Sequence, residues 1–323
     1  MRVLIAYDGS ECSEAILKDL QFGGLPLHAS VMVLSVASLQ VPTAHLTLEL
    51  LSSLRQVQSM GMESGAGRIP RFLGTDDAGT CHASHEAVVE MEWEGRRVKQ
   101  TVSQHFPEWF VEFQATDGGN ASESILQAAR DWRADLIIMG SHGWNGKNRQ
   151  FLRSVSATVA AESPCSVRVV HPRHRHPDSP LNLLLALDGS EASSHVVEWV
   201  MLRSFPRNTR VHILNVVDYT ETLGNRFSTA RQSLRATDSD IEGIHHMLDY
   251  YEAEVRPQYP RIESQIRYGD PRQEVFRYAR EQEIDAVFLG SHSGSKVDRP
   301  SFGSLASAGV REAETTVEIV RKI

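Results

Sequence analysis

Two glycine-rich segments have residue types and spacing suited to holding a phosphate group. The first reads GSHGWNGKNRQFLRSV over residues 140–155, and the second reads GSHSGSKVDRPSFGSL over residues 290–305. Glycine lets the backbone approach a ligand closely, and successive exposed N–H groups can form a concave anion site. In the first segment Lys147 and Arg149 add positive charge, and a helix predicted to open at Ser154 adds unpaired N–H donors. We therefore expect one or both segments to bind phosphate.

Neither segment contains the two best-defined phosphate-binding sequences. The Walker pattern G-x-x-x-x-G-K-[ST] is absent, and no G-x-G-x-x-G follows the first predicted strand. A tight strand-to-helix connection without any ligand is therefore the alternative explanation for these glycines.

An internal repeat places the two segments at matching points of the chain. VLIAYDGSECSEAIL from residue 3 matches LLLALDGSEASSHVV from residue 183, an offset of 180. The segment ending in ADLIIMGSH matches the one ending in IDAVFLGSH at an offset of 150. The first half therefore has extra residues between its two signatures. We expect them in a long Gly-rich loop within residues 40–85.

The repeat divides the chain into two domains, residues 1–172 and 180–323. The stretch HPRHRHPDSP over 171–180 is rich in proline and lacks apolar residues, which is typical of a linker. A chain of 323 residues is long enough for each domain to bury its own core.

Apolar strand runs alternate with helical patterns in each half. The runs are rich in Val, Ile and Leu and do not alternate strictly with polar residues, which is typical of strands covered on both faces. Strands joined by helices give a parallel sheet with right-handed crossovers. The predicted fold is α/β, a doubly wound sheet formed twice. In the first half the strands are VLIAY, SVMVLSV, FVEFQA, DLIIMG and SVRVV, and the helices run through SEAILKDLQF, EAVVEMEWEGRRVKQTV, ESILQAARDWR and the residues from Ser154.

The fold predicts where a ligand would bind. In a doubly wound sheet, ligands bind beyond the carboxyl ends of the strands, where the winding direction switches. The DGS turn follows the first strand of each half, and the glycine-rich segment follows the fourth. Both should project from the same edge of the sheet and form the walls of one pocket.

Together these residues resemble the nucleotide motif of the universal stress protein family. The spacing is similar to G-x2-G-x9-G-[ST], the DGS turn follows strand one, and SPCSVRVV (163–170) resembles the family's closing strand. The resemblance covers nearly the whole chain as two tandem domains. It implies a five-stranded, mostly parallel, Rossmann-like domain in each half. Some members of the family bind ATP or AMP, and others have lost the motif.

The phosphate motif matches in part in each half. In the first half Gly140 and Gly143 match, Arg153 stands at the third glycine position, and Ser154 is at the hydroxyl position. Arg153 could form an ion pair with a phosphate or fill its cavity.

In the second half Gly290 matches, Ser293 stands at the second glycine position, and Gly303 and Ser304 both match. Because serine is a small change from glycine, we favour the second half for binding.

The resemblance also implies contacts to the nucleoside: Asp8 and Asp188 beside the adenosine, Val36 and Val216 against the base, and Met139 and Leu289 flanking it. Local features alone give a second role for the DGS turns, since Asp and Ser there are candidate helix caps.

The resemblance implies a stress-associated regulator or sensor that binds ATP, ADP or AMP, with Mg²⁺ as a potential companion. No general base or nucleophile is evident, so any ATP hydrolysis should be slow. An interaction scaffold with decayed nucleotide sites, or a weak ATPase, is the alternative. An ATP pyrophosphatase would need an S-G-G-x-D-S loop after strand one, which AYDGSE lacks, and no pattern suits an electron-transfer flavoprotein.

Composition narrows the setting in which the protein acts. A net charge of −8 argues against general nucleic-acid binding, and no apolar segment approaches the ~20 residues that span a bilayer. Cys12, Cys81 and Cys165 are few and widely spaced, which suits a reducing compartment. We expect a cytoplasmic protein.

Several polar clusters have simpler explanations than chemistry. The repeated Ser141–His142 and Ser291–His292 are adjacent in sequence and lack a third orienting group, so loop-shaping hydrogen bonds explain them better than a nucleophile and base. CHASH (81–85) and HPRHRH (171–176) fit no zinc spacing, and we expect no metal site. IHHMLDYY (244–251) is predicted to be a helix face that presents aromatic residues to the core or to the other domain.

The last strand of each half, SVRVV and TVEIV, is predicted to lie at a sheet edge. In the family these strands pair antiparallel between subunits. Here the two halves can pair within one chain, which would close edges that otherwise invite aggregation. We expect a pseudo-two-fold intramolecular pair that can also dimerise, with a protein partner that the sequence does not identify.

Overall fold

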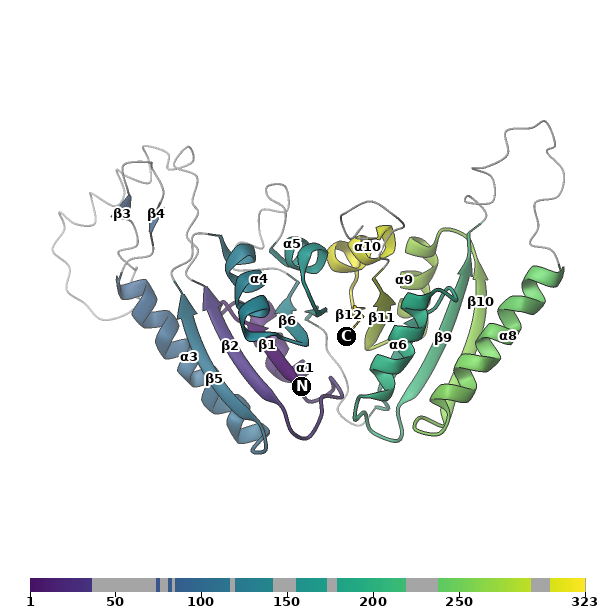
Figure 1. The fold of residues 1–323 in the computed structure, drawn as a ribbon, viewed down its shortest axis with the longest axis horizontal. Helices are drawn as coiled ribbons and strands as arrows, with labels where there is room; N and C mark the ends of the chain where they lie inside the picture. Colours follow the sequence, from purple (N-terminus) through teal and green to yellow (C-terminus); the bar gives the residue numbers. More distant parts are fainter. Residues whose placement is uncertain are drawn as a thin grey trace.

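The computed structural model of the chain describes residues 1–36, 74–75, 81–82, 85–116, 120–141, 155–172, 179–218, 238–291 and 303–322. Strands and helices alternate in both halves (Figure 1). The first half contains β1 (Arg2–Ala6), α1 (Glu11–Asp19), β2 (Ser30–Val36), β3 (Gly74–Thr75), β4 (Cys81–His82), α3 (His85–His105), β5 (Phe110–Thr116), α4 (Ala121–Trp132), β6 (Leu136–Gly140), α5 (Val155–Glu162) and β7 (Ser166–Val170). The second half contains β8 (Asn182–Ala186), α6 (Glu191–Met201), β9 (Arg210–Val217), α8 (Asp238–Val255), β10 (Arg261–Tyr268), α9 (Pro271–Glu281), β11 (Ala286–Gly290), α10 (Ser304–Glu312) and β12 (Thr316–Val320).

One ten-stranded sheet runs through the molecule in the order β10-β9-β8-β11-β12-β7-β6-β1-β2-β5. Within each half the five strands of this sheet are parallel, as the Val- and Ile-rich runs predict. The first strand of each half lies between the second and the fourth, so the winding direction switches beside β1 and beside β8. The predicted doubly wound α/β fold, formed twice, is confirmed.

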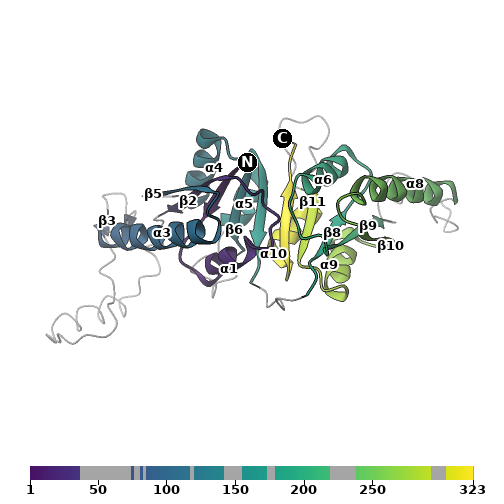
Figure 2. The ribbon, with the colours of Figure 1, turned by 90° about the horizontal axis from the view of Figure 1, so that it is seen from below.

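The two halves join through their last strands. β7 and β12 pair antiparallel, with Arg168 opposite Glu318. Figure 2 shows β12 in yellow at the middle of the sheet, where the halves meet. The predicted pairing of the halves within one chain is confirmed, and the strands expected at an edge lie at the centre of a continuous sheet.

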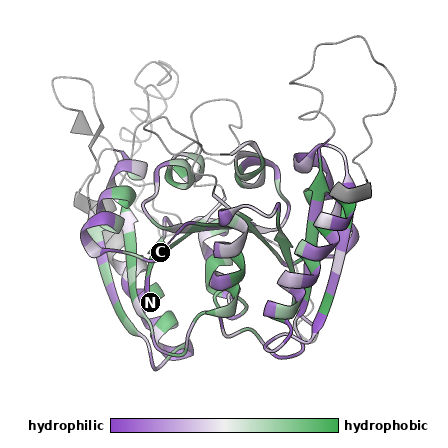
Figure 3. Cartoon of the chain, turned by 45° about the vertical axis from the view of Figure 1, so that its right-hand side comes forward, coloured by the Kyte–Doolittle hydropathy of each residue, from purple (hydrophilic) through white to green (hydrophobic). Residues whose placement is uncertain are grey.

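Helices cover both faces of the sheet, and each face encloses its own apolar layer. α1, α3, α6 and α8 pack on one face, and α4, α5, α9 and α10 pack on the other. Along β1, Val3 and Ile5 point to the first layer and Leu4 points to the second, because strand side chains alternate. In Figure 3 the strands are largely hydrophobic, whereas the helices also carry hydrophilic stretches.

Local sequence explains where the helices begin. Asn120 accepts a hydrogen bond from the N–H of Ser122 at the start of α4. Asp270 does the same for Arg272 at the start of α9, where Pro271 is the first residue. Both are favoured cap arrangements.

Two regions differ from the prediction in detail. Within the expected loop of 40–85, β3 and β4 form a short antiparallel pair, and residues 37–73 lie outside the described part of the chain. On α8, Tyr251 is buried in the first apolar layer, whereas Tyr250 is exposed. Among the described residues, no helix combines the length and apolar character needed to cross a membrane.

Candidate functional site

The predicted pocket walls lie side by side at the carboxyl edge of the sheet. β1 and β6 are neighbours with Ala6 opposite Met139, so the turn that follows β1 lies beside the end of β6. In the second half Ala186 of β8 is opposite Leu289 of β11. In Figure 1 α5 and α10 lie at this same end of the two half-sheets. The structure therefore brings the DGS turn and the first glycine of each motif together.

Asp8 and Asp188 hold their turns with the same three hydrogen bonds. The Oδ1 atom of Asp8 accepts from Ser10 N at 3.1 Å and from Ser13 Oγ at 2.5 Å, and the N–H of Asp8 donates to Ser13 Oγ at 3.2 Å. The side chain of Asp8 is exposed and that of Ser13 is buried. The aspartate thus fixes the turn from its solvent side.

The second half repeats this arrangement closely. Oδ1 of Asp188 accepts from Ser190 N at 3.0 Å and from Ser193 Oγ at 2.7 Å, and Asp188 N donates to Ser193 Oγ at 2.9 Å. Of the two candidate caps in each DGS turn, the serine is the N-cap, since Ser190 Oγ accepts from the N–H of Ser193. The aspartate braces the turn instead of capping the helix.

The first glycine of each motif is required by packing. A Cβ at Gly140 would lie 2.8 Å from Cys12 Cβ and 3.0 Å from its carbonyl carbon. A Cβ at Gly290 would lie 2.7 Å from Ala192 Cβ and 3.0 Å from its backbone. The first turns of α1 and α6 therefore approach the strand ends more closely than a residue with a Cβ at position 140 or 290 would allow.

The four apolar positions implied by the resemblance lie in or against the second apolar layer. Met139 and Leu289 are almost fully buried, at 4% and 1% exposed. Val36 is the last residue of β2 and Val216 the last but one of β9, and both pack against the same layer while partly exposed. Of these four, the two valines are the ones whose surfaces a ligand could reach.

Gly303 lies at the start of α10 and offers no side chain to cap that helix end. It is the N-cap residue, and among the described residues no side chain caps the helix. No described atom lies within 4 Å of a Cβ built at Gly303. Ser304 is the first helical residue, so the first N–H groups of α10 have no intrahelical partner. Such an end attracts anions.

Four predicted positions, Gly143, Arg153, Ser154 and Ser293, lie outside the described residues. The same is true of His142 and His292. Of the two Ser-His pairs, Ser141 is buried, with its Oγ 3.9 Å from Cys12 Sγ, and its carbonyl accepts from Ser156 Oγ at 3.1 Å. These contacts shape the start of the connection to α5.

A charged group on the first half fixes α3 beside the DGS turn. Arg97 of α3 lies 2.5 Å from Glu14 of α1 and donates to the hydroxyl of Tyr7 at 3.0 Å, and Tyr7 donates to Glu14. Burial raises the pKa of Glu14, but the hydrogen bonds from Tyr7 and Arg97 more than offset this, so its pKa is lowered. At the equivalent place in the second half Ser194 Oγ is 3.4 Å from the hydroxyl of Tyr251.

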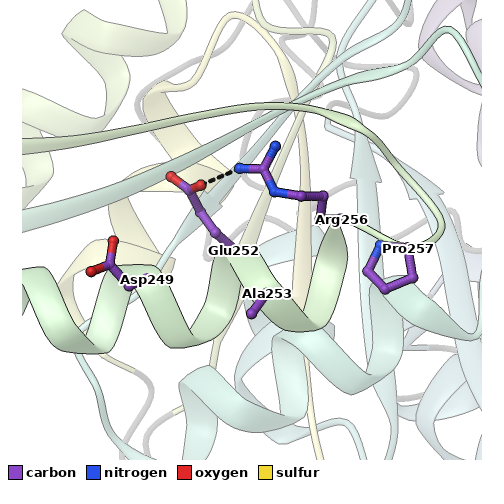
Figure 4. Close-up of a pocket in the computed structure, with 5 residues that line it drawn as sticks. All are labelled: Asp249, Glu252, Ala253, Arg256 and Pro257. Carbon is purple, nitrogen blue, oxygen red and sulfur yellow. Dashed lines mark hydrogen bonds and ion pairs between the residues drawn. The ribbon is translucent and has the colours of Figure 1, made fainter.

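Two further features of the described residues were candidates for a site. The described ranges contain no group of three or more His, Cys, Asp or Glu residues arranged to hold a metal ion. A hollow at the C-terminal end of α8 is lined by Asp249, Glu252, Ala253, Arg256 and Pro257 (Figure 4). Glu252 and Arg256 pair with each other there and need no ligand.

Sequence reasoning missed two features of the site. Ser13 and Ser193 brace the turns, and the repeated pattern DGS-x-x-S was the available signal. Cys12 and Ala192 are the residues that require Gly140 and Gly290, which no local pattern indicates.

The fold and the paired turns define a tandem, doubly wound α/β protein in which the DGS turn of each half lies beside the end of the fourth strand of that half's sheet, at the switch point. The model of the universal stress protein family matches residues 1–171 and 181–321, and the chain belongs to that family.

Relatives agree with this assignment. Over 52 residues, 16% of this chain, it is 48% identical to a universal stress protein of Thermus aquaticus, and over 107 residues, 31% of this chain, it is 31% identical to universal stress protein Sll1388 of Synechocystis. These matches span 38% and 66% of the two relatives' own lengths. A universal stress protein from Archaeoglobus fulgidus has a similar fold, with a TM-score of 0.59, 17% identity, and coverage of 99% of this chain and 96% of that one. The likeness to that structure shows the fold alone.

Proposed function

We propose that the chain binds an adenine nucleotide, ATP, ADP or AMP, at the switch point of its second half and acts as a stress-associated regulator in the cytoplasm. The observation that carries the proposal is the open N-terminus of α10. Gly303 has no side chain to cap this helix end, no other described side chain does so, and the helix follows β11, the neighbour of β8, whose turn holds Asp188. A phosphate chain would receive the free N–H groups of α10. Val216 would contact the base.

The first half is the weaker candidate. Its nucleoside and phosphate positions have the same arrangement as the equivalent positions of the second half: Asp8, Val36, Met139 and Gly140. The motif position equivalent to Gly303 is Arg153, whose guanidinium would pair with a phosphate or occupy its place. Nucleotide occupancy would change the surface around α10 that is offered to a protein partner. With no evident general base, any ATP hydrolysis would be slow, and Mg²⁺ would accompany ATP.

Calorimetric titration with ATP, ADP and AMP, with and without Mg²⁺, tests the proposal. Gly303→Glu places a carboxylate at the open end of α10, where it would repel phosphate, and should weaken ATP binding by about tenfold or more. Gly303→Ala is the matched control, because a Cβ there has space. Equal ATP affinity for both variants would contradict phosphate binding at α10.

A scaffold with decayed nucleotide sites is the second candidate. It is favoured by the packing at Gly140 and Gly290, since contacts with Cys12 and Ala192 explain these glycines without a ligand. If no binding is detected at millimolar ATP, the scaffold is the better-supported function.

A further inference from the structure

The junction between the halves is built from positions that are equivalent in the repeat. Arg168 and Glu318 are cross-strand partners and are 150 residues apart, which is the offset of the repeat in this region. On either side Val167 is opposite Ile319, and Val169 is opposite Val317. The pseudo-two-fold axis therefore passes between Arg168 and Glu318. In a symmetric pair, a residue at such an axis faces its own copy.

At this axis the two halves carry opposite charges. Nη1 of Arg168 donates to Glu318 at 2.7 Å, and its Nε and Nη2 donate to Asp19 at 2.6 and 2.9 Å. Glu318 also accepts from Trp199 Nε1 and from Arg203. Arg168, Arg203 and Glu318 are almost completely buried. Two cations and two anions thus alternate through the interior of the junction.

A second pair of equivalent positions differs in size. Gly23 and Arg203 are 180 residues apart, the offset of the repeat at α1 and α6, and Arg203 donates to the carbonyl of Gly23 at 3.3 Å. Beside them Ser204 N donates to Gly24 O at 2.7 Å, and the ring of Phe205 fills the space where a Cβ of Gly24 would lie. Gly23 and Gly24 of the first half thus leave room for the side chains of Arg203 and Phe205 of the second half.

We propose that this junction is selective for unlike halves, so that the first half accepts the second half and rejects a copy of itself. Two first halves would place Arg168 against Arg168 and leave the space beside Gly23 unfilled. Two second halves would place Glu318 against Glu318 and Arg203 against Arg203. Buried like charges in direct opposition are destabilising.

This selectivity would keep the pairing within one chain. β7 and β12 are then unavailable for pairing between identical halves of neighbouring chains, and any dimer of the whole chain must use another surface. The proposal is independent of nucleotide binding.

Mixing two full-length variants tests the proposal. Arg168→Glu keeps a native second half, and Glu318→Arg keeps a native first half, so each lacks the native junction and together they can form it between chains. In native mass spectrometry we expect the 1:1 mixture to give a dimer with one copy of each variant in excess of either homodimer. Homodimers as abundant as the mixed dimer, or wild-type X-ray scattering from both single variants, would overturn the proposal. Arg256→Glu, which reverses one charge of the ion pair with Glu252 at the end of α8, should behave as wild type.

A size-based variant covers the case in which the charge reversals fail to fold. Gly23→Arg gives the first half the residue of the second, whereas Gly23→Ala adds a Cβ whose nearest neighbour is 3.5 Å away. In Gly23→Arg we expect amide exchange about tenfold or more faster in 166–170 and 316–320, with β1 and β8 still protected. Gly23→Ala should exchange as wild type. Wild-type protection of both segments in Gly23→Arg would overturn the proposal, as would equal effects of the two variants.

Discussion

Glu318 of β12 accepts a hydrogen bond of 2.7 Å from Arg168 of β7, and both side chains are buried where the two halves meet. Burial raises the pKa of Glu318, but Arg203 and Arg168 outweigh it and lower that pKa below its usual range. Burial also opposes the charge on Arg168, yet Asp19 and Glu318 raise its pKa. Both groups therefore stay charged, and the charge of each stabilises the charge of the other.

Removing the carboxylate should destabilise the whole chain. Glu318→Gln leaves two buried guanidinium groups with reduced compensation, and loss of one partner of a buried pair costs about 3–5 kcal/mol. The free energy of unfolding from urea denaturation measures the loss. Glu281→Gln removes an ion pair with Arg267 at the surface and should change stability little. A similar small change for both variants would contradict the importance of the buried pair.

Acid should weaken the same junction. Because the pKa of Glu318 is lower in the folded chain than in the unfolded chain, the unfolded state binds more protons at acid pH. The contribution of Glu318 is therefore complete above the unfolded pKa of about 4.3 and is lost as pH falls through the folded value. Urea denaturation from neutral pH down to acid pH should show a steeper loss below about pH 4.3 in wild type than in Glu318→Gln. Parallel curves would contradict this assignment.

Gly24 should be intolerant of any side chain. It has a positive φ of 62°, and a Cβ there would lie 2.4 Å from the ring of Phe205. Gly24→Ala should therefore reduce the free energy of unfolding by about 2 kcal/mol or more. At the neighbouring Gly23, the nearest atom to a Cβ is Leu25 Cγ at 3.5 Å, so Gly23→Ala should be tolerated. Denaturant unfolding of the two variants side by side measures the difference.

Asp188 should act on both stability and binding through its Oδ1 atom. Asp188→Ala removes the acceptor for Ser190 N and for the buried hydroxyl of Ser193, which should cost about 1–2 kcal/mol and weaken ATP binding. Asp188→Asn retains an oxygen in this position and should preserve the turn. If the two variants unfold alike, the hydrogen bonds of Asp188 do not hold the turn.

The fold could be predicted from the sequence because its signals are local and occur twice. The runs SVMVLSV and SVRVV coincide with β2 and β7, since Val-rich runs between turn residues favour buried strands. The run SEAILKDLQF predicts a helix through Phe22, but α1 ends at Asp19, ahead of the turn at Gly23 and Gly24. Helix ends depend on such turns and are the hardest boundaries to predict.

The site and the junction were less predictable because their key contacts are distant in sequence. Gly140 is explained by Cys12, and Arg168 by Asp19 and Glu318, and no periodicity indicates these pairings. Arg168 and Glu318 interrupt their Val-rich runs in a way that suits an exposed edge as well as a buried pair. Only the antiparallel register brings the two charges together.

Gly290 offers a final test that separates packing from ligand binding. A Cβ there would lie 2.7 Å from Ala192 Cβ and 3.0 Å from the Ala192 backbone, so Gly290→Ala should displace the first turn of α6 and cost about 1–3 kcal/mol. Adding Ala192→Gly removes the nearer atom but not the backbone, and should restore only part of the stability. Because Ser190 caps this turn and Asp188 braces it, ATP affinity should fall and recover together with stability. Urea denaturation measures the stability of each variant, and calorimetry measures its ATP affinity. If stability falls while ATP affinity stays constant, this turn has no role in binding.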